Sequence, residues 1–183
     1  MENKLDSAEE LYKKLISPIE DKMISIVSRI VRDQEESTDV FQEVLAVIWR
    51  KLARIERHPN PHAYILRICI SRSYDALRKR SRRREVQLEL DKIKTIPAKM
   101  EKHLEVDEIV DGVREAILLL PVKQGQAILL RVVEDMPYNA IGDILGCSEV
   151  TARSHFSKGK TRIRKILSGT GVLGHNQENY DER

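Results

Sequence analysis

Apolar residues recur every three or four positions along most of the chain, which is the period of an amphipathic helix. In the first half this pattern predicts a short helix near 7–16, a second helix from Ser17, a third over 33–54 and a fourth over 61–84. The third helix carries a wide apolar stripe, which predicts that it packs against other helices. The stripe consists of Val40, Phe41, Val44, Leu45, Ile48, Trp49 and Leu52.

Polar residues at the expected helix starts define three of these boundaries. Ser17 precedes a proline and stands three positions before Glu20, which is the pattern of a capping box. Asp33 is followed by acidic residues, which suit the first turn of a helix. Asn60 precedes Pro61 and is expected to cap the fourth helix.

The second half shows a different helical arrangement. The apolar pattern predicts a helix from Val106, another over about 121–134, and a short helix over 138–145. Residues 146–148 form a tight turn, with a glycine at the end of one helix and a serine cap for the next. The following helix, 149–167, has a narrow apolar seam and many cations. A short helix, a glycine turn and a longer cationic helix form a helix-turn-helix pattern.

Composition favours a charged, soluble, helical protein. Of the 183 residues, 33% are charged and only 4% are aromatic, and glycine and proline are scarce, which argues against a large β-sandwich. The formal charge is only +3, from 32 basic and 29 acidic side chains. The cations are concentrated at 78–84 and 153–165 and the acids at 33–43 and 101–111, so the sum hides two basic surfaces.

Several classes of protein are excluded by what the sequence lacks. No apolar run approaches the roughly 18–20 residues of a membrane span, and the N-terminus lacks the apolar core of a signal peptide. We therefore expect a cytoplasmic protein with no membrane insertion. Cys69 and Cys147 lie far apart in apolar helices, which predicts two small buried residues. His58, His62 and His103 lack partners at ligand spacing, and no catalytic cluster is present, so we expect no metal, no cofactor and no enzymatic activity.

Two cationic stretches favour nucleic acid as a partner. Six of the seven residues from Arg78 to Arg84 are cationic. One or two cations would suffice at a solvated helix end, so this cluster indicates a polyanion site. The helix over 149–167 has no acid between Arg153 and Lys165, a one-sided charge that an ordinary helical hairpin would not need. Its N-terminal residues would enter the major groove: Glu149, Thr151, Arg153, Ser154, His155 and Lys158.

The two cationic helices belong to separate helical units. Residues 86–104 have no persistent apolar stripe and are interrupted by Pro97, which is typical of a linker. Residues 168–183 are rich in glycine and polar side chains and predict a flexible tail. A tether of about 20 residues, at most about 3.3–3.6 Å per residue, could separate the units by several turns of duplex. The sequence therefore predicts a protein that binds DNA at two sites of different sequence.

Motifs in both halves resemble the extracytoplasmic-function group of sigma factors, the small members of the sigma-70 family. The first half contains DVFQEV (39–44), WRKL (49–52), NPHAYILRI (60–68) and DALRK (75–79), which are similar to regions 2.2, 2.3 and 2.4. The second half contains LP (120–121) followed by Gln124, then YNAIG (138–142), LGCS (145–148) and TARSHF (151–156), which are similar to region 4. The resemblance covers nearly all of residues 8–167.

This resemblance implies an all-α fold of two small helical domains joined by a flexible linker. Residues 1–85 would be the region 2 bundle, which binds core polymerase and recognises and melts the −10 element. Residues 86–104 would be the linker, 105–167 the region 4 helix-turn-helix domain that recognises the −35 element, and 168–183 a flexible tail. The implied partners are core RNA polymerase, through its β′ clamp helices and β flap, promoter DNA, and a separate anti-sigma factor that no residue here identifies.

The matched motifs assign residues to three surfaces. The resemblance places polymerase binding at Asp39, Gln42, Glu43 and Trp49. It places −10 binding in the loop 56–60 and on the next helix, at Arg57, His58, Asn60, Tyr64, Arg67, Arg72, Arg78 and Lys79, with the following arginines as further cationic walls. It places −35 binding at Thr151, Arg153, Ser154, His155 and Lys158, where arginine and lysine suit guanine edges or phosphates.

Four positions depart from the family pattern. Ser71 stands near a position often held by asparagine, and Gly125 stands where relatives commonly have arginine. Gly142 places a glycine in the middle of a helix, which costs about 1 kcal/mol against alanine. His155 replaces a frequent arginine, which would weaken or alter contact with the −35 element.

The alternative is a conventional transcriptional regulator, in which a helix-turn-helix output domain follows a helical sensor or dimerisation domain. A sensor domain would need neither the acidic polymerase patch over 39–43 nor an arginine-rich helix beside a Pro-Asn-Pro loop. Residues 33–84 therefore discriminate between the two hypotheses.

Overall fold

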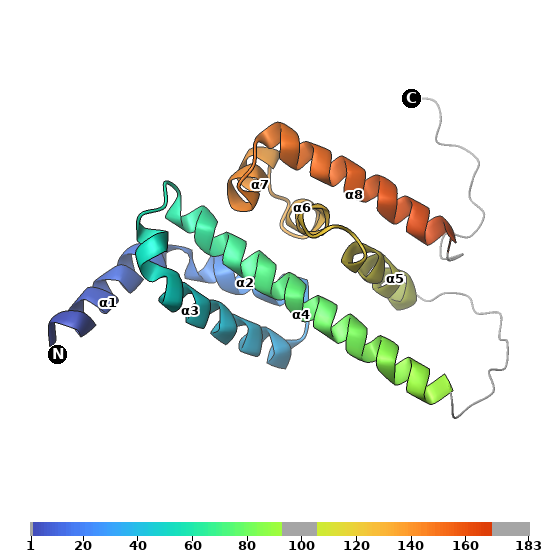
Figure 1. Cartoon of the computed structure of the whole chain (residues 1–183), viewed down its shortest axis with the longest axis horizontal. Coiled ribbons are helices and arrows are strands. Elements are labelled where there is room, and N and C mark those ends of the chain that lie inside the picture. Colours follow the sequence, from blue (N-terminus) through green and yellow to red (C-terminus); the bar gives the residue numbers. More distant parts are fainter. Residues whose placement is uncertain (1, 93–105, 170–183) are drawn as a thin grey trace.

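The computed structural model of the chain describes residues 2–92 and 106–169, and every regular element in those ranges is helical (Figure 1). The all-α prediction is confirmed. The first half contains α1 (Glu2–Leu15), a 3-10 turn η1 (Ser17–Ile19), α2 (Glu20–Val31), α3 (Gln34–Glu56) and α4 (Pro61–Lys92). The second half contains α5 (Val106–Leu118), α6 (Val122–Val132), α7 (Tyr138–Leu145) and α8 (Glu149–Gly169).

Three of the predicted helix starts form side-chain caps. Each capping side chain accepts a hydrogen bond from the backbone N–H three residues further on: Asp33 at 2.8 Å, Asn60 at 3.0 Å and Ser148 at 3.2 Å. These bonds satisfy N–H groups that the first turn of a helix leaves without a helical partner.

The capping box predicted at Ser17 does not form. Ser17 lies inside η1, which has no side-chain cap bond, and α2 begins only at Glu20. The Glu20 carboxylate instead accepts the hydroxyl of Tyr12 at 2.7 Å. This hydrogen bond raises the pKa of Tyr12 above its usual value, because it stabilises the protonated phenol and the phenolate would lie beside a carboxylate. The carboxylate that would close the box is therefore engaged by α1.

Three helices end later than the sequence predicts, and the first is α3, which ends at Glu56 rather than near residue 54. Helix α4 ends at Lys92 rather than near residue 84, so residues 86–92 of the predicted linker are helical. Helix α8 ends at Gly169, inside the predicted tail. The remaining linker residues, 93–104, and the tail residues 170–183 lie outside the described residues.

Two glycines shape the turn between α7 and α8. Gly146 ends α7 in the left-handed conformation, with φ of +63°, which glycine adopts without steric cost. At Gly142, an added β-carbon would lie 2.7 Å from the carbonyl oxygen of Cys147. The Gly142 carbonyl also accepts the Cys147 N–H at 2.9 Å. The close return of the chain over α7 therefore explains a glycine in mid-helix.

Helix α4 is the central element of the fold (Figure 1). It contacts α2 and α3 of the first half, and α5, α6 and α7 of the second half also pack against it. Helix α8 packs on α5, α6 and α7. One continuous apolar core therefore runs through both halves, and the two helical units lie against each other. The fully buried side chains that α4 contributes to this core include Ile65, Ile70 and Tyr74.

Candidate functional site

The four residues predicted to bind polymerase share the solvent-facing side of α3. Asp39, Gln42, Glu43 and Trp49 are all exposed, whereas the valines and isoleucine between them are buried in the core. The Trp49 side chain is 42% exposed, although tryptophan is usually largely buried. The face thus offers two carboxylates and an amide beside one aromatic side chain.

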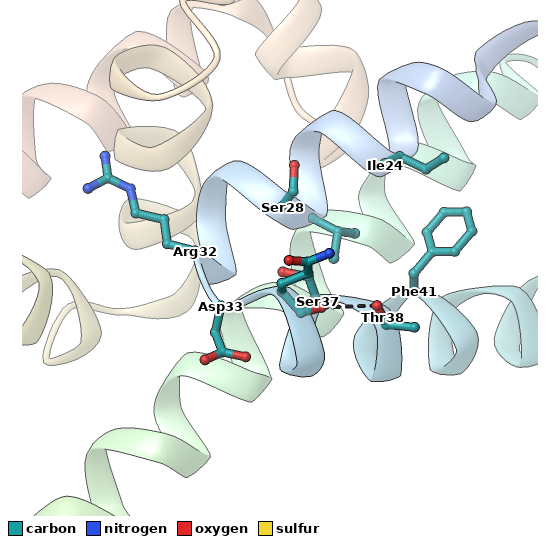
Figure 2. A pocket seen from close by; sticks show the side chains of 9 residues that line it. Ile24, Ser28, Arg32, Asp33, Ser37, Thr38 and Phe41 are labelled. Atoms are coloured by element: carbon teal, nitrogen blue, oxygen red, sulfur yellow. Dashed lines mark hydrogen bonds between the residues drawn. The ribbon is translucent and has the colours of Figure 1, made fainter.

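A groove of about 480 Å³ between α2 and α3 adjoins this face. Figure 2 shows Ile24 of α2 and Phe41 of α3 close together at one end of the groove, and Asp33 at the other. Ile24 is 47% exposed. Thr38 lines the groove one helical turn before Gln42, so the groove and the exposed face of α3 form one continuous surface.

The loop before α4 packs onto a tyrosine. The His58 ring meets Tyr64 edge-on, with ring centroids 5.0 Å apart, and its Nδ1 lies 2.8 Å from the carbonyl oxygen and 3.1 Å from the backbone nitrogen of Asn60. Arg54, near the end of α3, lies 5.8 Å from the centroid of the same tyrosine ring. Tyr64 is half-buried and Arg57 is exposed. Arg54 could not be predicted as part of this site, because helical spacing on α3 does not relate it to a ring on α4.

The predicted −10 cations on α4 occupy different environments. Arg72 lies 3.9 Å from an aspartate on its own helix, and Arg78 lies 5.9 Å from the centroid of an aromatic ring. Lys79 is exposed. The guanidinium of Arg67 lies against the backbone of Gly146 at the end of α7. The second helical unit therefore covers part of the surface predicted to bind DNA.

Arg80, inside the basic run, joins three helices. Its Nη1 donates to Glu36 Oε2 at 2.9 Å and to the carbonyl of Val31 at 3.3 Å. Val31 is the last residue of α2, where carbonyls lack a helical N–H partner. The guanidinium of Arg80 is therefore engaged within the first unit, and the role of the arginines after Lys79 in DNA binding stays a prediction.

The predicted −35 residues on α8 fall into two groups. Thr151, Arg153 and Lys158 are exposed, whereas Ser154 and His155 are half-buried. Burial lowers the pKa of His155, and the neighbouring cations Lys123 and Lys158 lower it further. The imidazole is therefore uncharged at neutral pH and presents a neutral hydrogen-bonding edge where an arginine would present a cation.

Arg153 is held in place by two neighbours. Its Nη2 donates to Glu149 Oε1 at 2.9 Å, and its guanidinium lies 4.7 Å from the ring centroid of Tyr138. Phe156 packs edge-on against the same ring, with centroids 5.8 Å apart. The arginine is therefore oriented at the N-terminal end of α8. The contact of Arg153 with Tyr138 could not be predicted from the sequence, since the ring belongs to α7.

The described residues offer no metal centre. Within 2–92 and 106–169, no three His, Cys, Asp or Glu side chains are grouped so that they could hold a metal ion. No helix in these ranges is both long and apolar enough to cross a bilayer. Cys69 is buried as predicted, and burial raises the pKa of its thiol to about 12. Cys147 is only half-buried, which corrects the prediction that both cysteines are buried.

Comparison with known proteins identifies both halves. Residues 15–83 match Sigma-70 region 2, and residues 111–163 match Sigma-70, region 4. The chain belongs to the sigma-70 family, in its extracytoplasmic-function group. Its role is that of an RNA polymerase sigma factor. The alternative of a regulator with a sensor domain is not favoured, because region 2 occupies the residues where such a domain would lie.

Three relatives illustrate the similarity. The RNA polymerase sigma-H factor of Pseudomonas aeruginosa is 27% identical over 166 residues, which cover 85% of this chain and 86% of that protein. The ECF RNA polymerase sigma factor SigW of Bacillus subtilis is 19% identical over 170 residues, which cover 87% and 90%. The sigma factor RpoE of Bartonella quintana, solved in complex with the anti-sigma factor NepR, aligns with a TM-score of 0.46 and 23% identity over 89% of this chain and 97% of RpoE.

Proposed function

We propose that this sigma factor uses three separate surfaces: α3 for core polymerase, the start of α4 and its preceding loop for the −10 element, and α8 for the −35 element. The proposal is supported by the different kinds of side chain that α3 and α8 expose to solvent. The exposed face of α3 contains carboxylates and an exposed tryptophan, whereas the exposed residues of α8 include six cations and one carboxylate, Glu149.

The polymerase surface suits a basic helical partner. Asp39 and Glu43 are one helical turn apart and both face solvent. Trp49 supplies a large apolar contact of the kind that dominates protein interfaces, and the neighbouring groove can accept an apolar side chain. We infer that the β′ clamp helices of polymerase occupy this surface. Contact of the second unit with the β flap, and a separate anti-sigma factor, stay predictions of the family resemblance.

The −10 surface suits an unpaired base. Tyr64 provides an aromatic ring on which a base can stack, and stacking needs no particular base. Arg54 and Arg57 lie at the same end of α4 and can bind the flanking phosphates. His58 and Asn60 shape the loop that would read a base turned out of the duplex.

The −35 surface suits the major groove of duplex DNA. Thr151, Arg153 and Lys158 are exposed on the N-terminal half of α8, which is the part of a recognition helix that reaches base edges. Arg153 is oriented by Tyr138, so it is suited to a bidentate contact with guanine. His155 is neutral and contributes hydrogen bonding without charge.

The polymerase surface is tested by charge reversal on α3. In the full chain, Asp39→Arg is expected to weaken the affinity for purified core polymerase by about tenfold, because it places like charges at the interface. Glu10→Arg is the matched control, since it reverses an exposed charge on α1, and it should bind core polymerase as the wild type does. Equal affinities for both variants would show that polymerase does not dock on this face of α3.

A further inference from the structure

We propose that the chain closes on itself, with the second helical unit covering the face of α4 that carries Arg67, Ser71 and Tyr74, and that Tyr74 and Gly125 form the lock that holds it closed. This inference rests on the proposed function, because it concerns access to the −10 surface.

Tyr74 of α4 is inserted into the second unit. Its side chain is completely buried, and its hydroxyl lies 3.0 Å from the carbonyl oxygen of Ile117 and 3.3 Å from that of Leu120. The Ile117 carbonyl accepts the N–H of Leu120 at 3.1 Å, but Pro121, four positions after Ile117, has no N–H to donate. The tyrosine hydroxyl therefore supplies a hydrogen bond that the helical ladder cannot give at the end of α5.

Gly125 of α6 makes room for the tyrosine ring. A β-carbon at this position would lie 2.5 Å from the Tyr74 hydroxyl oxygen and 2.8 Å from its Cε2. Atoms do not approach so closely, so any other residue at 125 must push the ring or the helix away. Gly125 is inside a helix, where alanine would be more stable by about 1 kcal/mol. The glycine is thus unfavourable for α6 alone and favourable for the closed arrangement.

The lock lies in a stripe along one face of α4. Arg67, Ser71, Tyr74 and Arg78 follow at spacings of four, three and four, which place them on one side of a helix. Three of the four contact the second unit: Tyr74 as described, Ser71 through a hydrogen bond from Gln126 Nε2 at 3.2 Å, and Arg67 against the end of α7. Arg67 is one of the residues predicted to bind the −10 strand, and in the closed chain its guanidinium lies against the backbone of Gly146.

Helix α2 of the first unit also contacts the second unit. Arg29 Nη1 donates to the carbonyl of Val133 at 3.2 Å and lies 3.8 Å from the carboxylate of Glu134. The contact between the two units therefore runs from the start of α4 to the loop after α6. If only the open fraction of molecules can bind a single strand, the apparent affinity is reduced by that fraction. Variants that break the lock should bind a single strand more tightly than the wild type.

The closure is measured by energy transfer in the full chain. Donor and acceptor dyes are attached to cysteines placed at Ala53 on α3 and Lys165 on α8, both exposed, with the half-buried Cys147 replaced by serine. In this background Gly125→Ala is expected to lower the transfer efficiency and to tighten binding of a mixed-sequence single-stranded oligodeoxynucleotide. Gly169→Ala is the matched control, because a β-carbon at that helix position meets nothing within 4 Å. It should leave both quantities unchanged.

Tyr74→Phe provides a second variant that keeps the ring and removes only the hydroxyl. Loss of one hydrogen bond should raise the ratio of open to closed molecules by about two- to tenfold, with the helical circular dichroism unchanged. Wild-type transfer efficiency in both Gly125→Ala and Tyr74→Phe overturns the lock. Lower efficiency without tighter oligonucleotide binding overturns the claim that closure hides the DNA surface. Binding of the same proteins to core polymerase reports on the proposed function independently of either result.

Discussion

Lys79 and Arg80 are adjacent cations on α4 with opposite surroundings, and replacing each by glutamine should separate DNA binding from stability. Arg80→Gln removes the bonds of the guanidinium to Glu36 Oε2 at 2.9 Å and to the Val31 carbonyl at 3.3 Å. Hydrogen bonds to charged groups contribute about 1.5–3 kcal/mol. The side chains of Arg80 and Glu36 are 40% and 30% exposed. Solvent screening therefore reduces the expected loss of unfolding free energy to about 1–2 kcal/mol.

Lys79→Gln is the matched variant, because Lys79 is exposed on the same turn of the helix. Its free energy of unfolding should stay within about 0.5 kcal/mol of the wild type. Its single-strand binding should depend less on salt, because glutamine cannot neutralise a phosphate. The log–log slope should be smaller by about 0.7 for each phosphate that the lysine neutralises in the wild type.

Both quantities are measured on the same preparations, by urea unfolding followed by circular dichroism and by fluorescence anisotropy with a labelled oligonucleotide at several salt concentrations. We expect Arg80→Gln to lower the free energy of unfolding and to retain the wild-type salt slope. If Arg80→Gln instead unfolds like the wild type and loses salt dependence as Lys79→Gln does, the assignment of Arg80 to the interior of the first unit is refuted.

Three other groups give distinct expectations. Burial raises the pKa of Glu134 above its ordinary 4.5, so the folded chain holds this proton more tightly than the unfolded chain, and the resulting stability is present below pH 4.5 and is lost as pH rises through the raised pKa. Glu134→Gln should flatten that decline in urea titrations, and an unchanged decline would contradict the burial. His155→Arg adds a cation where a lowered pKa keeps the wild type neutral. Duplex binding should therefore tighten, and its salt slope should steepen by about 0.9 for each additional phosphate neutralised. An unchanged slope would show that residue 155 does not approach a phosphate of the duplex. A thiol reagent at pH 8 should modify half-buried Cys147 and spare Cys69, whose pKa is raised to about 12, until denaturant is added; equal rates in the native protein would refute the difference.

Local chemistry explains which features the sequence could predict. The caps at Asp33, Asn60 and Ser148 need only a side chain and the N–H three residues on, so they follow from the sequence. The predicted cap at Ser17 failed because Glu20 is engaged by Tyr12, a partner on the preceding helix. A helix boundary predicted from a short motif fails in this way whenever a side chain of the motif binds a partner on another helix.

Contacts between distant residues could not be predicted. Tyr74 and Ile117 are 43 positions apart, and helical spacing relates only residues on the same helix. Gly125 was visible in the sequence only as a departure from a family pattern, and the reason for it is the ring that lies against it. Likewise, a run of cations does not show which one is paired, because the partner of Arg80 comes from another helix.

The surfaces on the two units make sense only if this chain directs polymerase to promoters. Transcription in vitro from fragmented genomic DNA, with purified core polymerase and this protein and with sequencing of the RNA 5′ ends, measures that most directly. We expect start sites that core polymerase alone does not use, preceded by two unlike sequence elements at a fixed spacing. No new start sites, together with specific binding of a palindromic site by the protein alone, would contradict this expectation.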